Sequence, residues 1–297
     1  MTRERFSRVH TMGSVEEADT ISVTRSKLWT DRRSDHGPFD IIGDVCGCHG
    51  ELFTLLDRLG YQRPDGEHAG ALQHPDGRRA LFLGDLVYRG PGVTEVLDVA
   101  MSMVEAGSAL CILGNHENKL GRALAGRNVT VSHGLAESLE QLDQRGPEYR
   151  AAVKAFVDGL VSHYVLDDGR LVVAHAGLSE RYHGRASGRV RSLALYGDSS
   201  GETDEYGYPV RYPWASDYRG SASVVYGHTP VLNAEWENNT ICIDTGVVFG
   251  GELTALRWPE RDLVAVPAER HYYEPSRPWL MTNRPLSGPR SCSMSPT

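Results

Sequence analysis

The feature that most constrains this chain is a set of short apolar runs, each followed by a polar side chain suited to binding a metal ion. The runs are rich in β-branched residues, which is typical of buried strands. One Gly-Asp pair alone is more simply a turn, and one buried histidine is more simply a core residue. Five runs that each end in such a residue predict a shared site, because ligands gather at the carboxyl ends of strands in α/β sheets. These ends are Gly43-Asp44, Gly84-Asp85, Gly114-Asn115-His116-Glu117, His175 and Gly227-His228.

The order of the predicted elements favours an α/β fold. Strands are predicted over Phe39–Ile42, Ala80–Leu83, Ala109–Leu113, Leu171–Ala174, Ser223–Tyr226, Thr240–Ile243, Leu253–Trp258 and Leu263–Val266. Apolar residues at intervals of three and four predict amphipathic helices over Glu51–Leu59, Val93–Glu105 and Tyr149–Leu160. Strands and helices alternate early and strands dominate late, so we expect a layered β-sandwich flanked by helices.

Both ends of the chain differ in composition from its middle. Residues 1–36 are polar and charged without sustained periodicity, which predicts an extended or disordered N-terminal segment. Residues 271–297 are rich in Pro, Ser and Arg, which predicts a flexible C-terminal tail. We therefore expect the folded domain to span residues 37–270.

The charge and the cysteine content exclude some classes of protein. With 39 acidic and 31 basic residues the formal net charge is −8, which argues against binding nucleic acid through a basic surface overall, although a local patch could do so. Five scattered cysteines do not suggest a disulfide framework. The sequence shows no signal peptide and no apolar run of about 18 residues, so we expect a cytoplasmic protein without membrane association.

The polar side chains at the strand ends form a recognisable donor set. Carboxylate, amide oxygen and imidazole together suit Mn, Fe, Zn or Ni. Their delivery from one sheet edge would gather them around a pair of ions. Two divalent ions about 4 Å apart can clamp a phosphate and activate a water molecule. The residues alone thus predict a site for a pair of divalent metal ions.

The motifs GDVCG, GDLVYRG and GNHE, with His175 in AHAG and His228 in YGHTP, resemble those of the calcineurin-like binuclear metallophosphoesterases in order and spacing. Over about residues 28–270 the chain looks most similar to the phosphatase module of bacterial polynucleotide kinase-phosphatase, an RNA end-healing enzyme. The neighbouring kinase and nucleotidyltransferase modules have no counterpart, since no GxxxxGK[ST] loop occurs. The resemblance implies the metallophosphoesterase fold and two divalent ions, Mn first, with Ni, Fe or Zn as alternatives.

The resemblance also implies roles for individual residues. Asp44 would bind the first metal and Asp85 would bridge both, whereas the second metal would be bound by Asn115, His175 and His228.

Three further residues would act on the phosphate. His116 would stabilise the transition state or protonate the leaving oxygen, and Arg89 would fork onto phosphate oxygens. Asp244 in CIDTG matches another position in the family's active-site region.

The sequence departs from the family pattern at two positions. Cys46 occupies a position where the family has histidine, and Tyr88 one where it has aspartate. Cys46 could bind the first metal as a thiolate and shift preference toward Zn, His49 could substitute for it, or the first metal could lack a ligand. Tyr88 removes a carboxylate near His116, so we expect weaker general acid catalysis.

Two side-chain clusters suggest nucleic acid contacts, each with a simpler alternative. The arginines at 181, 185, 189 and 191 would suit a phosphodiester chain or form a solvated loop. The aromatic residues at 206, 208, 212, 214 and 218 could stack on a terminal base or simply pack.

We therefore expect a metal-dependent phosphomonoesterase that removes 2′ or 3′ phosphates, including 2′,3′-cyclic phosphate, from nucleic acid ends or acts on another phosphomonoester. The absent modules could act in trans as repair-complex partners. One alternative is a protein serine/threonine phosphatase or dinucleoside tetraphosphatase of the same superfamily. Another is a degenerate module that binds RNA ends or a repair partner without turnover, because of Cys46 and Tyr88.

Overall fold

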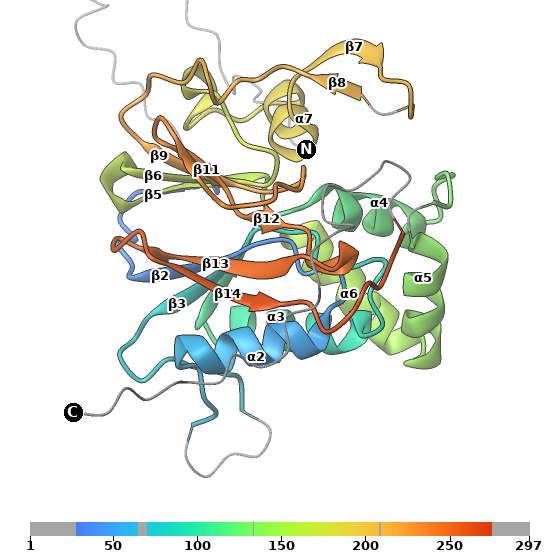
Figure 1. The fold of residues 1–297 in the computed structure, drawn as a ribbon. Coiled ribbons are helices and arrows are strands. Elements are labelled where there is room, and N and C mark those ends of the chain that lie inside the picture. Colours follow the sequence, from blue (N-terminus) through green and yellow to red (C-terminus); the bar gives the residue numbers. More distant parts are fainter. Residues whose placement is uncertain (1–27, 65–69, 133, 208, 275–297) are drawn as a thin grey trace, which may run out of the picture.

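The computed structural model describes residues 28–64, 70–132, 134–207 and 209–274, and its two six-stranded sheets pack against each other (Figure 1). The first sheet has the order β1 (Asp31–Arg32), β5 (His163–Leu166), β6 (Leu171–Ala174), β9 (Ser223–Tyr226), β11 (Thr240–Cys242), β10 (Trp236–Glu237). The second has the order β12 (Asp244–Thr245), β13 (Glu252–Trp258), β2 (Phe39–Ile42), β3 (Arg79–Phe82), β4 (Ala109–Cys111), with β14 (Leu263–Pro267) paired to β13.

The alternation of side chains along the strands explains the layers. On β2, Phe39 and Ile41 pack in a cluster shared by both sheets, with Val173 and Val225 of the first sheet, whereas Ile42 belongs to the cluster under the helices. Every residue of β2 is buried, as expected for a strand covered on both faces. The expected layered α/β sandwich is confirmed.

Helices cover the outer face of the second sheet and border its end (Figure 1). They are α2 (His49–Leu59), α3 (Val93–Glu105), α4 (Asn115–Leu124), α5 (Leu135–Gln144) and α6 (Pro147–Gly159). Over the first sheet lie α7 (Gly188–Tyr196) and a hairpin of β7 (Ser199–Thr203) and β8 (Pro209–Arg211). Short 3-10 turns span Asp167–Gly169, Glu180–Tyr182 and Val247–Phe249.

Strand direction fixes the position of the candidate site. Strands β2, β3 and β4 run parallel to one another, and so do β6, β9 and β11. The carboxyl ends within each set therefore lie at one edge of their sheet, as the motif pattern predicts.

The structure differs from the sequence expectations at both ends of the domain. Residues 31–32, which we assigned to the N-terminal segment, form β1 and pair in parallel with Val165 and Leu166. At the other end the backbone N–H groups of Tyr272 and Tyr273 donate to the carbonyl of Val248, so the first residues of the predicted tail pack on the domain. Residues 1–27 and 275–297 lie outside the described part of the chain.

Within the described residues, no helix combines the length and the apolar character needed to cross a membrane.

Candidate metal centre

Loops from both sheets bring the predicted side chains to one place. Asp44 follows β2 and Asp85 follows β3, while α4 begins at Asn115 just after β4. From the first sheet, His175 follows β6 and His228 follows β9. Candidate ligand atoms of Asp85, His175 and His228 all lie within 4.8 Å of one another, which makes this the one group of three His, Cys, Asp or Glu residues suited to a metal ion in the described part of the chain.

The surroundings of His175 fit a cation. Its Nδ1 lies 3.0 Å from the carbonyl oxygen of Leu83, and a proton there leaves Nε2 with a lone pair. Around Nε2 lie Asn115 Oδ1 at 2.8 Å, His228 Nδ1 at 3.1 Å and Asp85 Oδ1 at 3.4 Å. One ring nitrogen can share at most one proton with these groups, so a positive ion satisfies the set better than hydrogen bonds do.

The pKa values of the buried histidine and aspartates also indicate a site that favours a cation. Burial by itself lowers the pKa of His175, but the carboxylates of Asp85 and Asp44 outweigh it and raise that pKa to about 10. Burial raises the pKa of Asp244 to about 6. The pKa of Asp44 is also raised, mainly by burial and secondly by the negative charge of Asp244. Several carboxylates thus share one buried region that favours positive charge.

Asp44 supplies an independent sign of a missing partner. Its Oδ2 accepts a hydrogen bond of 3.1 Å from the backbone N–H of His228, but its Oδ1 is buried and has no hydrogen-bond partner among the described residues. An unsatisfied buried polar atom costs about 1–3 kcal/mol, and more when charged. The backbone at residues 227–228 can lie this close to Asp44 because residue 227 is glycine; a Cβ there would lie 2.1 Å from Asp44 Oδ1.

A second carboxylate, which the sequence analysis left without a role, holds the Asp85 loop. Glu117 accepts hydrogen bonds from the backbone N–H groups of Asp85 and Leu86, both at 2.8 Å, and of Val87 at 3.2 Å. The backbone N–H of Gly114, which precedes α4, also donates to Glu117 at 3.1 Å. An acidic residue at the third position of a helix is a capping signal, and that signal could have found Glu117 in the sequence.

Cys46 and His49 lie outside the three-residue cluster. Cys46 is buried with a left-handed backbone (φ 48°), and its N–H donates to the carbonyl of Asp85 at 2.7 Å. Burial raises the pKa of its thiol well above the usual value. His49 packs against Gly92 before α3, where a Cβ would lie 2.1 Å from its Nδ1. Neither Cys46 nor His49 therefore belongs to the cluster that contains His175 and His228.

Tyr88 lies against His116, as the motif position predicts. The two rings stack with centroids 4.3 Å apart and an interplanar angle of 23°. Tyr88 is fully buried, and its hydroxyl has no hydrogen-bond partner among the described residues. His116 Nδ1 lies 3.7 Å from Asp85 Oδ2, and burial lowers the pKa of His116 to about 4. His116 thus has an aromatic neighbour where the family pattern supplies a carboxylate.

Two arginines approach the centre from different elements. Arg89 has a left-handed backbone (φ 63°), and its guanidinium lies over the rings of Phe249 at 5.3 Å and Tyr273 at 5.6 Å. Arg211 extends from β8 and places Nη2 2.6 Å from His228 Nε2, while Nη1 donates to the carbonyl of Tyr196. Sequence reasoning missed Arg211 because the segment shows an aromatic pattern and no local signal of the hairpin's direction.

Comparison with known proteins decides the family. Residues 37–260 match the calcineurin-like phosphoesterase family. The chain belongs to this family. Its members share the hydrolase chemistry of metallophosphoesterases, and the α/β sandwich described above is the corresponding fold.

Relatives of this calcineurin-like phosphoesterase carry one recurring name. A protein of Anoxybacillus flavithermus, named bis(5′-nucleosyl)-tetraphosphatase PrpE (asymmetrical), is 43% identical over 238 residues, which is 79% of this chain and 96% of the relative. A protein of Geobacillus sp. with the same name is 46% identical over 237 residues, 78% of this chain and 95% of the relative. A solved structure provisionally named a diadenosine tetraphosphatase aligns with a TM-score of 0.58 and 26% identity, covering 80% of this chain and 97% of that one.

These names correct one expectation. They support the dinucleoside tetraphosphatase that the sequence analysis gave as an alternative, and they do not support the resemblance to polynucleotide kinase-phosphatase or a nucleic acid end as substrate. The metal motifs could not separate these readings, because they belong to the phosphoesterase family as a whole.

The residues predicted to contact nucleic acid divide between exposed and packed side chains in this phosphoesterase. Arg181, Arg185 and Arg189 are exposed, whereas Arg191 is half-buried and donates to Asn118 Oδ1 at 3.1 Å. Among the aromatic residues, Trp214 packs edge-on against Tyr218, with centroids 6.0 Å apart. Tyr206 and Tyr212 are exposed, and Tyr208 lies outside the described residues.

Proposed function

We propose that this phosphoesterase hydrolyses dinucleoside tetraphosphates asymmetrically, to a nucleoside monophosphate and a nucleoside triphosphate. The observation that carries the hydrolytic part is the convergence of Asp85, His175 and His228 on one point within 4.8 Å. The substrate class is supported by relatives of that name, which are 43–46% identical over at least 95% of their own length.

Two divalent ions fit the side chains. We assign one to Asp85, Asn115, His175 and His228, and the other to Asp44 and Asp85 with Cys46 or Asp244 beside them. When bound, such ions supply Lewis acidity to the phosphate and activate the attacking water. Glu117 contributes by fixing the backbone of residues 85–87, so that Asp85 is held before any ion arrives.

Arg89 and Arg211 are the groups available to bind phosphate oxygens. A guanidinium matches two phosphate oxygens with two parallel N–H donors. Arg211 reaches the metal centre beside His228, and Arg89 lies in the motif that carries Asp85. Between them they would orient the scissile phosphate relative to the attacking water.

The stacking of Tyr88 on His116 is consistent with a phosphoanhydride substrate. Tyr88 gives His116 a stacked ring and no additional carboxylate. A leaving nucleotide phosphate is a far weaker base than the alkoxide that leaves from a sugar phosphomonoester, so it depends less on a general acid. We infer that the Tyr88 departure restricts phosphomonoester hydrolysis more than anhydride hydrolysis.

Turnover assays test this function. The protein is incubated with Mn, Ni or Zn and a dinucleoside tetraphosphate, an RNA bearing a 3′ phosphate, or an aryl phosphate, beside Asp85→Ala. We expect equal amounts of nucleoside mono- and triphosphate, and a higher kcat/KM for the tetraphosphate than for the RNA. Two nucleoside diphosphates as products, or a preference for the RNA, would contradict the proposal. Background rates in both proteins would favour the non-catalytic alternative.

A further inference from the structure

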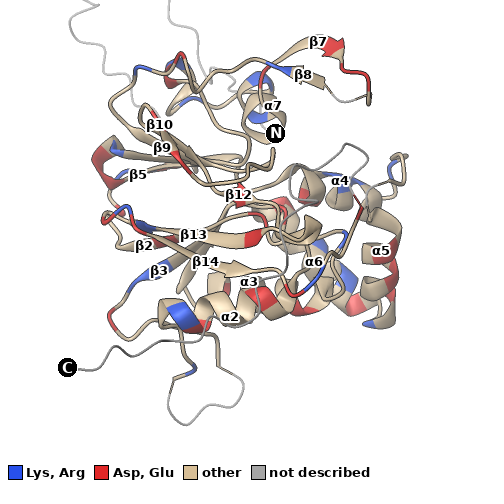
Figure 2. Ribbon diagram, viewed as in Figure 1, with Lys and Arg blue, Asp and Glu red and all other residues tan. Residues whose placement is uncertain are grey.

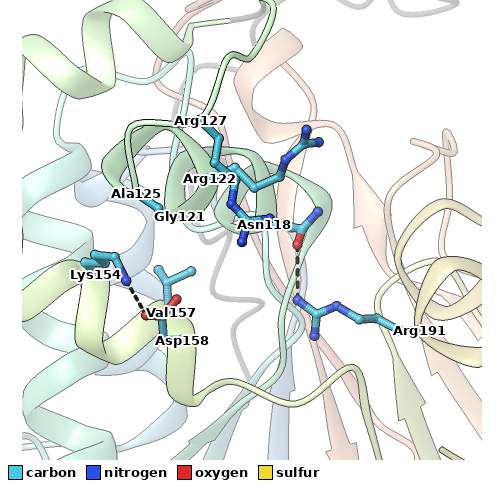
Figure 3. A pocket seen from close by; sticks show the side chains of 9 residues that line it. All are labelled: Asn118, Gly121, Arg122, Ala125, Arg127, Lys154, Val157, Asp158 and Arg191. Carbon is cyan, nitrogen blue, oxygen red and sulfur yellow. Dashed lines mark hydrogen bonds and ion pairs between the residues drawn. The ribbon is translucent and has the colours of Figure 1, made fainter. Parts of the chain in front are cut away.

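A basic pocket of about 510 Å³ lies between α4, α6 and α7 (Figure 3). Its charged lining comes from Arg122 and Arg127 near the end of α4, Lys154 and Asp158 on α6, and Arg191 on α7. We call these four cationic residues and the space between them the basic pocket. A volume of this size accommodates a nucleotide-sized ligand.

The positive charge of the basic pocket is mostly unneutralised. Lys154 pairs with Asp158, and Arg191 donates to the neutral amide oxygen of Asn118. The side chains of Arg122 and Arg127 form no hydrogen bond or ion pair with any residue in the described ranges. Three guanidinium groups therefore remain without a carboxylate, in a chain whose formal net charge is −8.

The charge distribution makes this cluster a local exception. Basic side chains occur on α4, α6 and α7 around the pocket, whereas α3 and α5 carry mainly acidic ones (Figure 2). A polyanion is repelled by most of such a surface, so attraction depends on patches where cations gather. Unpaired guanidinium forks are the protein groups that best match phosphate oxygens.

Helix α4 connects the basic pocket to the metal centre. It begins with Asn115 and His116 at the centre and continues through Asn118 to Arg122. At 1.5 Å per residue, the backbone of Arg122 lies about 10 Å along the helix from Asn115. A second connection passes through the end of α7, where Asn118 Nδ2 donates to the hydroxyl of Tyr196 at 2.9 Å and the carbonyl of Tyr196 accepts from Arg211.

We propose that the basic pocket binds the distal phosphates of the substrate's polyphosphate chain, an inference that rests on the proposed function. A tetraphosphate extended along α4 would leave its first anhydride at the metal centre and its remaining three phosphates near the unpaired arginines. Water attacks the phosphorus on the metal-centre side of that anhydride and loses a proton to solvent. The P–O bond to the distal chain breaks, and the nucleoside triphosphate leaves from the basic pocket with the electron pair of that bond. The pocket thereby accounts for an asymmetric cut, because it fixes which anhydride reaches the metal centre.

The test compares two double variants with the same loss of charge. Arg122→Ala/Arg127→Ala alters the basic pocket, and Arg181→Ala/Arg185→Ala alters two exposed arginines before α7. We expect the first variant to raise KM for the dinucleoside tetraphosphate about tenfold and to yield some nucleoside diphosphate through loss of register, with aryl phosphate turnover within about twofold of wild type. The second variant should keep the wild-type KM and product ratio.

Two results would overturn the inference: equal effects of both variants, or no effect of the first, whether or not the second has one. Binding of inorganic tripolyphosphate to the metal-free protein separates this inference from the proposed function. If the wild type hydrolyses no dinucleoside tetraphosphate, the proposed function fails. Tripolyphosphate binding that is lost only in Arg122→Ala/Arg127→Ala would still establish the basic pocket as a polyphosphate site, and its retention in that variant would refute it.

Discussion

The two halves of the proposed metal centre are built differently. In the half formed by Asn115, His175 and His228, the Nε2 atom of His175 lies 2.8 Å from Asn115 Oδ1 and 3.1 Å from His228 Nδ1. The carbonyl oxygen of Leu83, 3.0 Å from His175 Nδ1, orients the ring. In the half that contains Asp44 and Cys46, one carboxylate oxygen is unsatisfied and the thiol lies outside the cluster. We infer that the His175 half binds its ion in a preformed geometry, whereas the Asp44 half must adjust.

Removing the residue shared by both halves should have the largest effect. Asp85→Ala deletes the carboxylate that lies 3.4 Å from His175 Nε2, and with it the bridge proposed between the two ions. We expect kcat/KM to fall on the order of 10³-fold, because the ions supply several kcal/mol of transition-state stabilisation. Elemental analysis should show fewer than one metal ion per chain. Two bound ions in a folded Asp85→Ala protein would contradict the shared role.

A substitution beside Asp44 should remove only the ion bound in the half that contains Asp44 and Cys46. The Cβ of Gly227→Ala would meet Asp44 Oδ1 at 2.1 Å, so the carboxylate must move. We expect loss of one ion per chain and a fall in activity of roughly 10–100-fold, as for other changes that misplace metal ligands. Gly159→Ala is the matched control, because a Cβ there would contact nothing within 4 Å. Loss of both ions would show that the halves are not separable.

Restoring the family's histidine should reduce the difference in metal affinity between the two halves. Cys46 has a φ of 48°, a region in which histidine is among the better tolerated residues. Cys46→His should tighten binding of the weaker Mn equivalent about tenfold, since imidazole suits Mn better than a thiol does. Isothermal titration calorimetry measures both equivalents. An unchanged or weakened second equivalent would identify Cys46 as a working feature of this chain.

A buried histidine outside the proposed ligand set should give the smallest effect and a baseline for pH; it is His163 on β5, which pairs with Ala174 of β6. Burial lowers the pKa of His163 to about 4, against about 6.5 for a free histidine. The unfolded chain therefore binds more protons between these values, so stability is lost as pH falls from 6.5 to 4. The upper bound is about 3 kcal/mol at pH 4, and nothing is lost at pH 7. Chemical denaturation of the metal-free His163→Gln protein should show a flatter pH dependence; an identical slope would contradict it.

Sequence patterns located the parts of the site that follow strands. Asp85, His175 and His228 could be placed because a β-branched run ending in a polar residue is a local signal. Arg211 could not, since its position depends on how the β7–β8 hairpin folds over the first sheet. The same limit applies to Arg191, whose contact with Asn118 joins helices far apart in the sequence.

The fold shows the same division between local and long-range information. Strand β2 and helix α3 begin and end where their periodicity predicts, because their apolar faces are continuous. Strand β1 is only two residues long and is held by pairing with β5 across more than a hundred residues, which no local pattern encodes. Tyr273 likewise looked like part of a tail, yet its ring lies under the guanidinium of Arg89.

The most direct test is anomalous X-ray diffraction from crystals of the protein soaked with limiting and then saturating Mn. At limiting Mn we predict one anomalous peak between His175 Nε2, His228 Nδ1 and Asp85, and at saturation a second peak on the Asp44 side of Asp85. A first peak on the Asp44 side would reverse the order of the two halves. No peak within bonding distance of His175 and His228 would contradict the metal centre itself.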